Sequence, residues 1–307
     1  MNLIETVRST TWLHFQQIDS AVGKTVWFAS EAGQVTGSFK YRAATSVVHN
    51  VDAPGFIAAS SGNFGQALAC ACKLKGVPCI IVMPTTSAQV KIDAVRSHDA
   101  EVVFVDTAVQ TRADKVKEIV VDYPDYHVAS PYDCDWVIQG NSSLGREIHQ
   151  HLSNPEVVLV PIGGGGLISG IAEALEHNDN DVLLWGAEPA MADDAARSLE
   201  KGERLFNEGE PQTVADGART RSVGVRNWIR IQRRVSNILR VSEESICKAL
   251  CLLHSMGVEV EPTGALTLGA LLEHSIDVDE VVVVISGKNV DSTLYDSIIQ
   301  KGDLSTP

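Results

Sequence analysis

Short runs of apolar and β-branched residues recur along the chain and alternate with stretches of helical periodicity. Continuous apolar runs are typical of strands covered on both faces of a sheet. Between them, apolar positions such as Ala67, Leu68 and Ala71 recur about once per helical turn. This alternation predicts an α/β fold with mostly parallel sheets. The predicted strands are 26–30, 56–60, 79–83, 102–106, 157–162, 182–188 and 281–286.

The stretch 197–237 is the least regular, because it is rich in glycine and charge, and we expect loops there. The 307 residues are 44% hydrophobic, which is enough to bury the core of one large α/β domain or two smaller ones. No internal repeat, low-complexity tract or long linker divides them.

The net charge of −14 argues against broad binding to nucleic acid or anionic lipid, since both require a basic surface. A small-molecule partner fits better. No run is long enough to cross a bilayer and the start lacks a secretory pattern, so we expect a cytoplasmic protein. The cysteines are then reduced and serve core packing. They are Cys70, Cys72, Cys79, Cys134, Cys247 and Cys251.

A lysine follows a Gly-Ser turn and an aromatic residue in Thr36-Gly37-Ser38-Phe39-Lys40. Partial burial of Lys40 would lower the pKa of its amine and make it a nucleophile. Taken alone, the segment is more typical of a surface lysine at a helix start.

The segment Ser60-Ser61-Gly62-Asn63-Phe64-Gly65 joins a predicted strand to a predicted helix. Free backbone N–H groups and the positive end of the helix dipole at such a point suit a carboxylate. Ser61 and Asn63 add side-chain hydrogen bonds. The alternative is an ordinary N-cap, because Ser and Asn are preferred there.

Two further motifs also follow predicted strands. Gly163, Gly164, Gly165 and Gly166 lose much backbone entropy on folding, so a phosphate-binding loop explains them better than a structural turn. Their spacing fits neither the dinucleotide fingerprint nor the P-loop. The second motif is Ser286-Gly287-Lys288-Asn289. It places a hydroxyl where parallel sheets bind ligands, although it could equally cap a helix.

Together, TGSFKYR, SSGNFGQA, PIGGGGL and ISGKNVD resemble the fold-type II enzymes that use pyridoxal 5′-phosphate (PLP). The resemblance is strongest to the serine racemase and serine/threonine dehydratase family and runs from about Thr11 to Asp291. It implies a tryptophan synthase β-like fold with two open, mostly parallel sheets and helices on both faces. It also implies a large domain of 1–54 and 134–307, a small mobile domain of 55–133, PLP in the cleft between them, and a homodimer.

The resemblance assigns the cofactor contacts. Lys40 would hold PLP as a Schiff base and later remove the substrate α-proton, with Phe39 and Gly217 on the two faces of the ring. Asn63 would bind the ring hydroxyl and Ser286 the pyridine nitrogen. A neutral hydroxyl at that nitrogen weakens delocalisation into the ring and so favours prompt expulsion of a β-substituent. The phosphate would be held by the N–H groups of Gly163, Gly164, Gly165, Gly166 and Leu167.

The resemblance also assigns substrate and metal contacts. Ser61, Gly62 and Asn63 would bind the substrate carboxylate. The Glu-Pro-x-x-Ala-Asp-Asp pattern implies Mg²⁺ or Ca²⁺, which prefer hard oxygen ligands. The alternative is that the two carboxylates are solvated or cap a helix with Asp193. The metal ligands would be Glu188, Ala192 and Asp194.

Some positions depart from the family pattern and leave the exact substrate open. Phe64 and Tyr132 stand where the family has other residues, and Gly140-Asn141-Ser142-Ser143 replaces its usual GQGT. The arginines after Gly217 suggest a solvated or subunit-contacting face, although Arg219 or Arg221 could reach a second substrate carboxylate. These arginines are Arg219, Arg221, Arg226, Arg230, Arg233 and Arg234.

The resemblance favours a dehydratase that eliminates water from L-serine, L-threonine or a β-hydroxy relative to give a 2-oxo acid and ammonia. One alternative is a racemase in which Lys40 and Ser61 act on opposite faces of the α-carbon. Others are a β-replacement enzyme of the cysteine synthase type and an inactive PLP-binding protein. Because the chain stops at Pro307, we expect no C-terminal regulatory domain.

Overall fold

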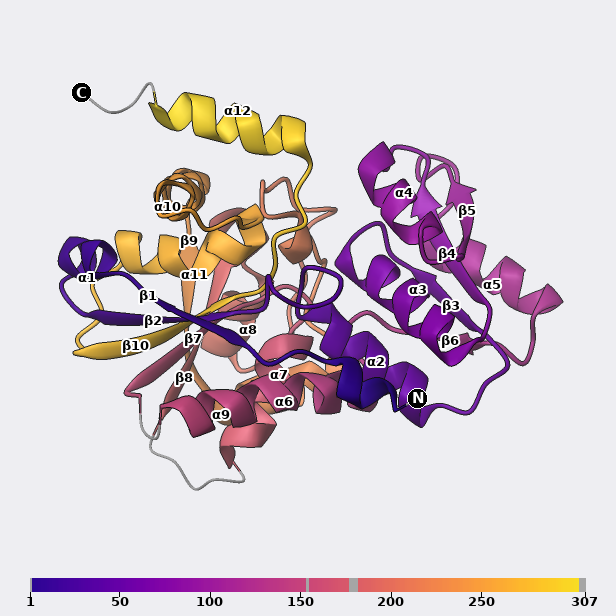
Figure 1. Cartoon of the computed structure of the whole chain (residues 1–307), viewed down its shortest axis with the longest axis horizontal. Helices are drawn as coiled ribbons and strands as arrows, with labels where there is room; N and C mark the ends of the chain where they lie inside the picture. The colour runs from indigo at the N-terminus through magenta and orange to yellow at the C-terminus, as the bar shows by residue number, and fades with distance from the viewer. Residues whose placement is uncertain (1, 153–154, 177–181, 304–307) are drawn as a thin grey trace.

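The computed structural model describes residues 2–152, 155–176 and 182–303, whose strands form two sheets (Figure 1). The larger sheet has the order β1-β2-β10-β7-β8-β9 and is parallel except for β1. Its strands are β1 (Thr11–His14), β2 (Thr25–Ser30), β7 (Val157–Pro161), β8 (Leu183–Pro189), β9 (Val235–Val241) and β10 (Glu280–Ile285).

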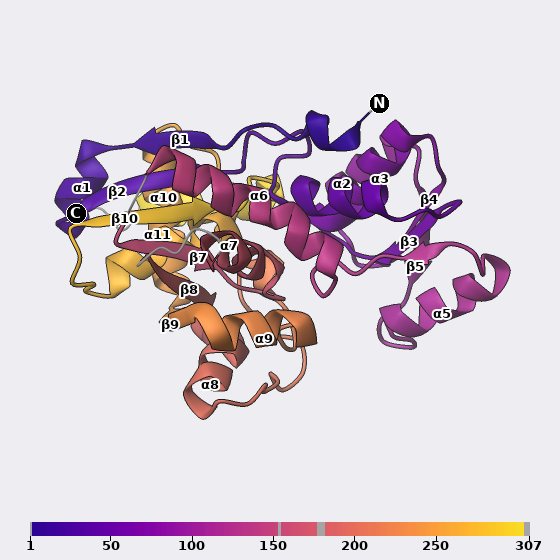
Figure 2. The same cartoon turned by 90° about the horizontal axis from the view of Figure 1, so that it is seen from below.

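The smaller sheet is parallel throughout, in the order β5-β4-β3-β6. With its helices it forms one end of the molecule in both views, and we call it the small unit and the remainder the large unit (Figures 1 and 2). The small unit consists of β3 (Phe56–Ala59), α3 (Asn63–Lys75), β4 (Cys79–Pro84), α4 (Gln89–Arg96), β5 (Glu101–Val105), α5 (Arg112–Asp122) and β6 (His127–Val128).

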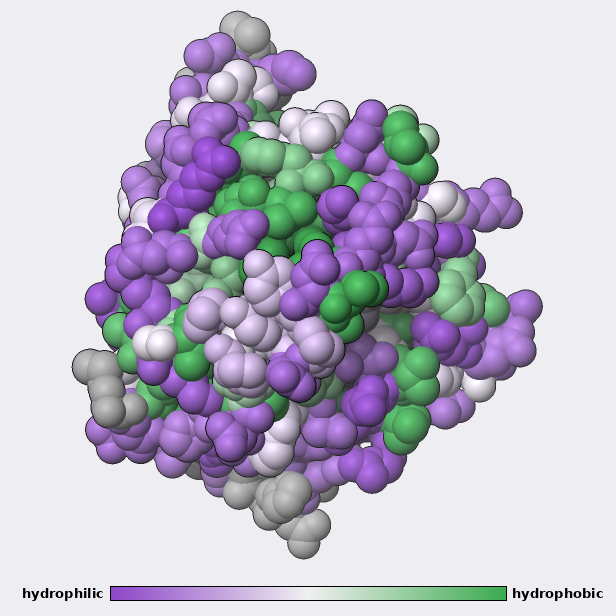
Figure 3. All heavy atoms as spheres, turned by 90° about the vertical axis from the view of Figure 1, so that its right-hand side faces the viewer, coloured by the Kyte–Doolittle hydropathy of each residue, from purple (hydrophilic) through white to green (hydrophobic). Residues whose placement is uncertain are grey.

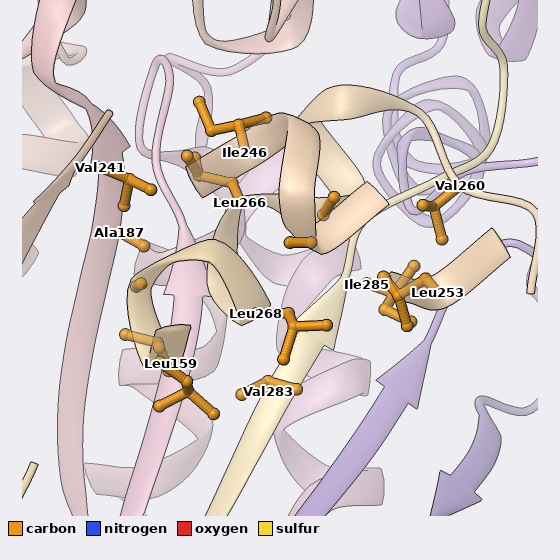
Figure 4. Close-up of a cluster of buried hydrophobic side chains, with 14 of the residues drawn as sticks. Leu159, Ala187, Val241, Ile246, Leu253, Val260, Leu266, Leu268, Val283 and Ile285 are labelled. Atoms are coloured by element: carbon orange, nitrogen blue, oxygen red, sulfur yellow. The ribbon is translucent and has the colours of Figure 1, made fainter. Parts of the chain in front are cut away.

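Helices cover both faces of the larger sheet. Successive residues of β10 point to opposite faces, so their neighbours show which helices lie on each side. Val283 and Ile285 pack with α1, α10 and α11, as Figure 4 shows for part of this cluster. Val282 and Val284 pack with α6, α7, α8 and α9. The helices of the large unit are α1 (Gln16–Val22), α2 (Lys40–Asn50), α6 (Asp135–His151), α7 (Gly166–Glu176), α8 (Asp194–Lys201), α9 (Val225–Arg234), α10 (Glu243–Ser255), α11 (Pro262–Glu273) and α12 (Ser292–Asp303).

Three short 3₁₀ helices complete the large unit. They are η1 (Leu3–Thr6), η2 (Ala190–Ala192) and η3 (Asp216–Ala218).

All seven predicted strands are confirmed, and β1, β6 and β9 are additional. The expectation of loops over 197–237 is wrong in part, because α8, η3, α9 and the start of β9 lie there. The N-terminus of α9 is fixed from far along the chain, since the carboxylate of Asp133 accepts the N–H groups of Val225 and Arg226 at 3.1 and 3.0 Å. A contact over such a sequence distance leaves no local signal.

The six cysteines are free, as the composition predicted, and Cys70, Cys72 and Cys79 are buried. Among the described residues, no helix combines the length and apolar character needed to span a bilayer. The end of the molecule formed by the small unit shows apolar patches among hydrophilic side chains (Figure 3).

Candidate active site

The candidate lysine site lies at the end of the loop that connects β2 to α2. Lys40 is the first residue of α2, and its Nζ donates a hydrogen bond to the Pro131 carbonyl at 2.7 Å. The amine also lies 4.8 Å from the centroid of the Phe39 ring. Burial lowers the pKa of Lys40 to about 8, against an opposing effect of the Glu261 carboxyl. The amine is therefore far closer to its nucleophilic form at neutral pH than an ordinary lysine.

The loop after β10 holds the loop that precedes Lys40. Phe39 donates its backbone N–H to the Ser286 carbonyl at 3.0 Å, and Lys288 donates to the Gly37 carbonyl at 2.9 Å. Ser286 is buried, and its hydroxyl has no hydrogen-bond partner within the described part of the chain. Since an unpaired buried hydroxyl is costly, it fits an acceptor or donor on a ligand.

The glycine loop lies between β7 and α7. The backbone N–H groups from Gly163 to Leu167 have no hydrogen-bond acceptor among the residues described. A Cβ on Gly164 would lie 2.2 Å from Cγ of Tyr132, and one on Gly163 would lie 2.6 Å from the Gly217 carbonyl oxygen. Larger residues are excluded, and the loop presents uncommitted donors at a helix N-terminus, which suits a phosphate.

The serine-rich loop follows β3. The Ser60 hydroxyl accepts the Gly65 N–H at 3.1 Å, while Ser61 is half-buried. Asn63 is the first residue of α3 and contacts the large unit through its side chain. The predicted carboxylate-binding residues Ser61, Gly62 and Asn63 therefore lie together at the start of α3.

The predicted ring-facing glycine lies in η3. Gly217 is exposed and donates its N–H to the Thr263 hydroxyl at 3.0 Å. Its neighbour Asp216 forms an ion pair with Lys91 of α4, which connects the large and small units. This cross-unit contact was not predicted.

The predicted metal ligands lie at the end of β8 and in the segment that connects it to α8. Glu188 and Asp194 are both buried, and Ala192 lies in η2 between them. Glu188 accepts the N–H groups of Ala195 and Ala196 at 3.2 and 2.6 Å and so caps α8. Asp194 accepts the Val223 N–H at 2.9 Å.

Burial raises the pKa of Glu188, and the nearby Asp194 carboxylate raises it further. Burial also raises the pKa of Asp194, to about 6. Two buried carboxylates that repel each other suit a hard divalent cation. No cluster of three His, Cys, Asp or Glu side chains able to hold a metal occurs in the described residues, so the metal stays a prediction.

Sequence reasoning missed several residues of the site. Glu261, directly before α11, accepts from the Asn63 amide. A Pro at the first turn of a helix marks this position in the sequence, but not the direction of the side chain. The Pro131 carbonyl at Lys40 had no local signal. Tyr132 was singled out as a departure from the family pattern, but its ring was not expected against Gly164.

Much of the arginine set ties α9 to neighbouring elements. Arg230 pairs with Glu173 of α7 at 2.6 Å, and Arg226 with Asp135 of α6 at 3.2 Å. Arg219 donates to the Thr213 carbonyl at 2.8 Å. A role for Arg219 or Arg221 at a second substrate carboxylate stays a prediction.

The motifs of Lys40, Ser286 and the glycine loop follow β2, β10 and β7, which are neighbouring parallel strands of the larger sheet. Ligands of open α/β sheets bind outside these carboxyl ends. An amine of lowered pKa suits an aldehyde, the free N–H groups suit a phosphate, and the unpaired Ser286 hydroxyl suits a ring nitrogen. PLP carries all three groups, so fold and site together define a PLP-dependent enzyme.

Comparison with known proteins supports the assignment to the PLP-dependent enzymes. The family described as "Pyridoxal-phosphate dependent enzyme" matches residues 4–287, and the chain belongs to this family. It is 32% identical to serine racemase of Mus musculus, over 95% of this chain and 90% of that protein. It is also 32% identical to L-threo-3-hydroxyaspartate ammonia-lyase of Saccharomyces cerevisiae, over 96% and 92%. The crystal structure of a threonine deaminase from T.th. superposes with a TM-score of 0.89 at 37% identity, covering 94% of this chain and 96% of that one.

Proposed function

We propose that the protein is a PLP-dependent dehydratase that eliminates water from a small L-hydroxy-amino acid, giving a 2-oxo acid and ammonia. The observation that carries this proposal is the unpaired Ser286 hydroxyl beside the lysine loop. A neutral partner for the ring nitrogen favours departure of a β-substituent over a long-lived carbanion. Relatives named as ammonia-lyase and threonine deaminase support the same reaction.

Bound PLP supplies an electron sink for the bond broken at the α-carbon. The residues of the chain transfer the proton and bind the substrate carboxylate and the phosphate. The Lys40 amine, with its lowered pKa, takes up the α-proton at Nζ and holds it. The N-terminus of α3 with Ser61 and Gly62 binds the substrate carboxylate, and the glycine loop holds the phosphate.

The small unit is the element that we propose closes over the substrate, with boundaries at 55 and 133. Its strands and helices lie between those positions, and Asn63 and Lys91 reach across to the large unit. Closure excludes water from the site and so protects reactive species from side reactions.

The test is turnover of L-serine, L-threonine and L-threo-3-hydroxyaspartate by the PLP-loaded enzyme, with 2-oxo acid and ammonia measured. We expect equimolar products from at least one substrate and none from the Lys40→Ala variant. Thioether formation from an added thiol would instead indicate β-replacement. No turnover of any amino acid would indicate an inactive PLP-binding protein.

Racemisation is the second candidate function. The half-buried Ser61 side chain forms no hydrogen bond within the described chain, so its hydroxyl is free to exchange a proton on the face opposite Lys40. Serine racemase of Mus musculus is among the relatives. Chiral analysis of the remaining substrate separates the two reactions, because only a racemase accumulates the D-enantiomer.

We further propose Mg²⁺ or Ca²⁺ at Glu188, Ala192 and Asp194, supported by the two buried carboxylates and their raised pKa values. The role is structural, since Asp194 holds the Val223 N–H and the Val223 side chain lies near Gly165. Chelation should lower activity and melting temperature, and added metal should restore both. If neither responds, and Asp194→Ala matches Glu210→Ala, the metal site is not there.

The acidic composition and the six free cysteines support a cytoplasmic protein, and the family resemblance supports a homodimer. Light scattering on the purified chain measures its mass in solution. A mass close to 33.0 kDa would contradict the dimer.

A further inference from the structure

The side-chain amide of Asn63 is held by the large unit at both ends. Its Nδ2 lies 2.9 and 3.0 Å from the two carboxyl oxygens of Glu261. Its Oδ1 accepts from Asn289 Nδ2 at 2.7 Å. Asn289 is anchored in turn, because the same Nδ2 lies 2.7 Å from the Thr36 carbonyl oxygen. A residue of the small unit is thus fixed by two residues of the large unit.

These partners leave one donor of the amide free. A primary amide has two N–H groups and one acceptor oxygen. The two Glu261 oxygens belong to one carboxyl group and are almost equally far from Nδ2, so they lie in one direction from it and we infer that one N–H serves both. The amide oxygen is engaged by Asn289. The second N–H therefore has a fixed direction, and neither Glu261 nor Asn289 uses it.

Glu261 is itself rigidly placed. It is 2% exposed, and its backbone N–H donates to the Gly287 carbonyl at 3.1 Å, next to Ser286. Pro262 begins α11 immediately after it. The carboxyl position is therefore set by the same loop that carries the predicted ring-nitrogen ligand.

Glu261 also faces three charged groups on three elements. These are Lys40 of α2, Lys91 of α4 and Asp216 of η3. Burial and the Asp216 carboxylate raise the pKa of Glu261 to about 8, against the Asn63 hydrogen bond and the two lysines.

We propose that Glu261 and Asn289 are positioning residues that clamp Asn63 and aim its free N–H at the ring oxygen of the cofactor. This inference rests on the proposed function, and it assigns Glu261 and Asn289 roles in the same site. Because Asn63 belongs to the small unit, the clamp forms only when the two units are closed. Cofactor binding and closure are then coupled through one amide.

The test compares Glu261→Leu with Glu261→Gln, because the glutamine amide oxygen can still accept from Asn63. PLP affinity of the apoprotein is measured by fluorescence titration, together with the absorption spectrum of the bound cofactor. A lost hydrogen bond of this kind weakens binding by about tenfold. We expect that loss and a shifted spectrum for Glu261→Leu, and affinity within about threefold of wild type for Glu261→Gln.

A matched control lies on the same helix. Glu273, at the far end of α11, accepts the Ser242 N–H at 2.8 Å, and Glu273→Leu should leave PLP affinity and spectrum unchanged. A second readout needs no cofactor. In the apoprotein, Asn63→Ala and Glu261→Leu each remove the same contact between Asn63 and Glu261. Their losses in melting temperature should therefore not add in the double variant.

Additive losses, or Glu261→Leu with wild-type affinity and spectrum, would overturn the clamp. So would Glu261→Gln as weak as Glu261→Leu. If Glu261→Leu does not fold, Asn289→Leu is measured in the same way and must show the same loss. A wild-type protein that binds no PLP defeats the proposed function instead, and the apoprotein cycle then decides the clamp alone.

Discussion

Removing one partner of the buried ion pair between Arg42 and Glu31 should destabilise the protein strongly. Both side chains are at most 1% exposed, and Nε of Arg42 lies 2.6 Å from Oε2 of Glu31. A second nitrogen donates to Oε1 of Glu31 at 2.9 Å, and a third donates to Glu147 at 2.7 Å. Burial alone would lower the pKa of Arg42, but the two carboxylates outweigh it and raise the pKa. The arginine lies in α2, two residues after Lys40, so it also fixes the start of the lysine helix.

The size of the effect follows from the missing partner. Leaving a buried charge unpaired costs about 3–5 kcal/mol. An unfolding entropy of about 2.1 cal/mol/K per residue, over 307 residues, converts each kcal/mol into about 1.6 °C. Arg42→Met leaves the buried Glu31 without a cation and should therefore lower the melting temperature by about 5–8 °C. Glu31→Leu should cost less, because Arg42 keeps its ion pair with Glu147. The double variant should recover much of this loss, because a well-packed apolar pair replaces the ions.

Scanning calorimetry of the apoprotein at neutral pH measures the three variants, and PLP titration shows whether the lysine helix stays in place. Glu118→Leu, which removes an exposed carboxylate on α5, serves as control and should shift the melting temperature by less than about 1 °C. A double variant that loses as much as the two single variants together would refute the reasoning. So would a wild-type melting temperature for either single variant.

Three further predictions concern the site. Acylation of Lys40 in the apoprotein should be half-maximal near pH 8, because burial lowers its pKa, and a midpoint near 10.5 would contradict this. Ser61→Ala should lose racemisation more than elimination from the L-substrate, whereas equal losses would show that Ser61 mainly binds the carboxylate. Gly164→Ala should weaken PLP binding at least about tenfold, because its Cβ would lie 2.2 Å from Cγ of Tyr132, and normal affinity would contradict the glycine cradle.

The strands and the cofactor motifs could be predicted because their signals are local. Runs such as 281–285 are apolar throughout, as expected for strands covered on both faces. A motif that directly follows such a strand lies at its carboxyl end, where parallel sheets bind ligands. This is why the motifs of Gly163 and Ser286 could be placed at strand ends from local signals, whereas Lys40 was brought to the same site by the family resemblance.

The remaining parts depend on contacts between distant residues. Asn63 and Glu261 are 198 positions apart, and a buried glutamate before a helix has the same local sequence whichever way its side chain points. Of the apolar residues of α9 only Ile231 is fully buried, and the helix also depends on Asp133 and on ion pairs to α6 and α7. The two-residue strand β6 is too short for a period-two pattern.

The most direct test of the account is borohydride reduction of the PLP-loaded protein, followed by peptide mapping. Reduction fixes the cofactor to the amine that carries it. We predict a single pyridoxyl group on Lys40, the amine whose pKa burial lowers at the ends of β2, β10 and β7. A label on any other lysine, or none at all, would contradict the site.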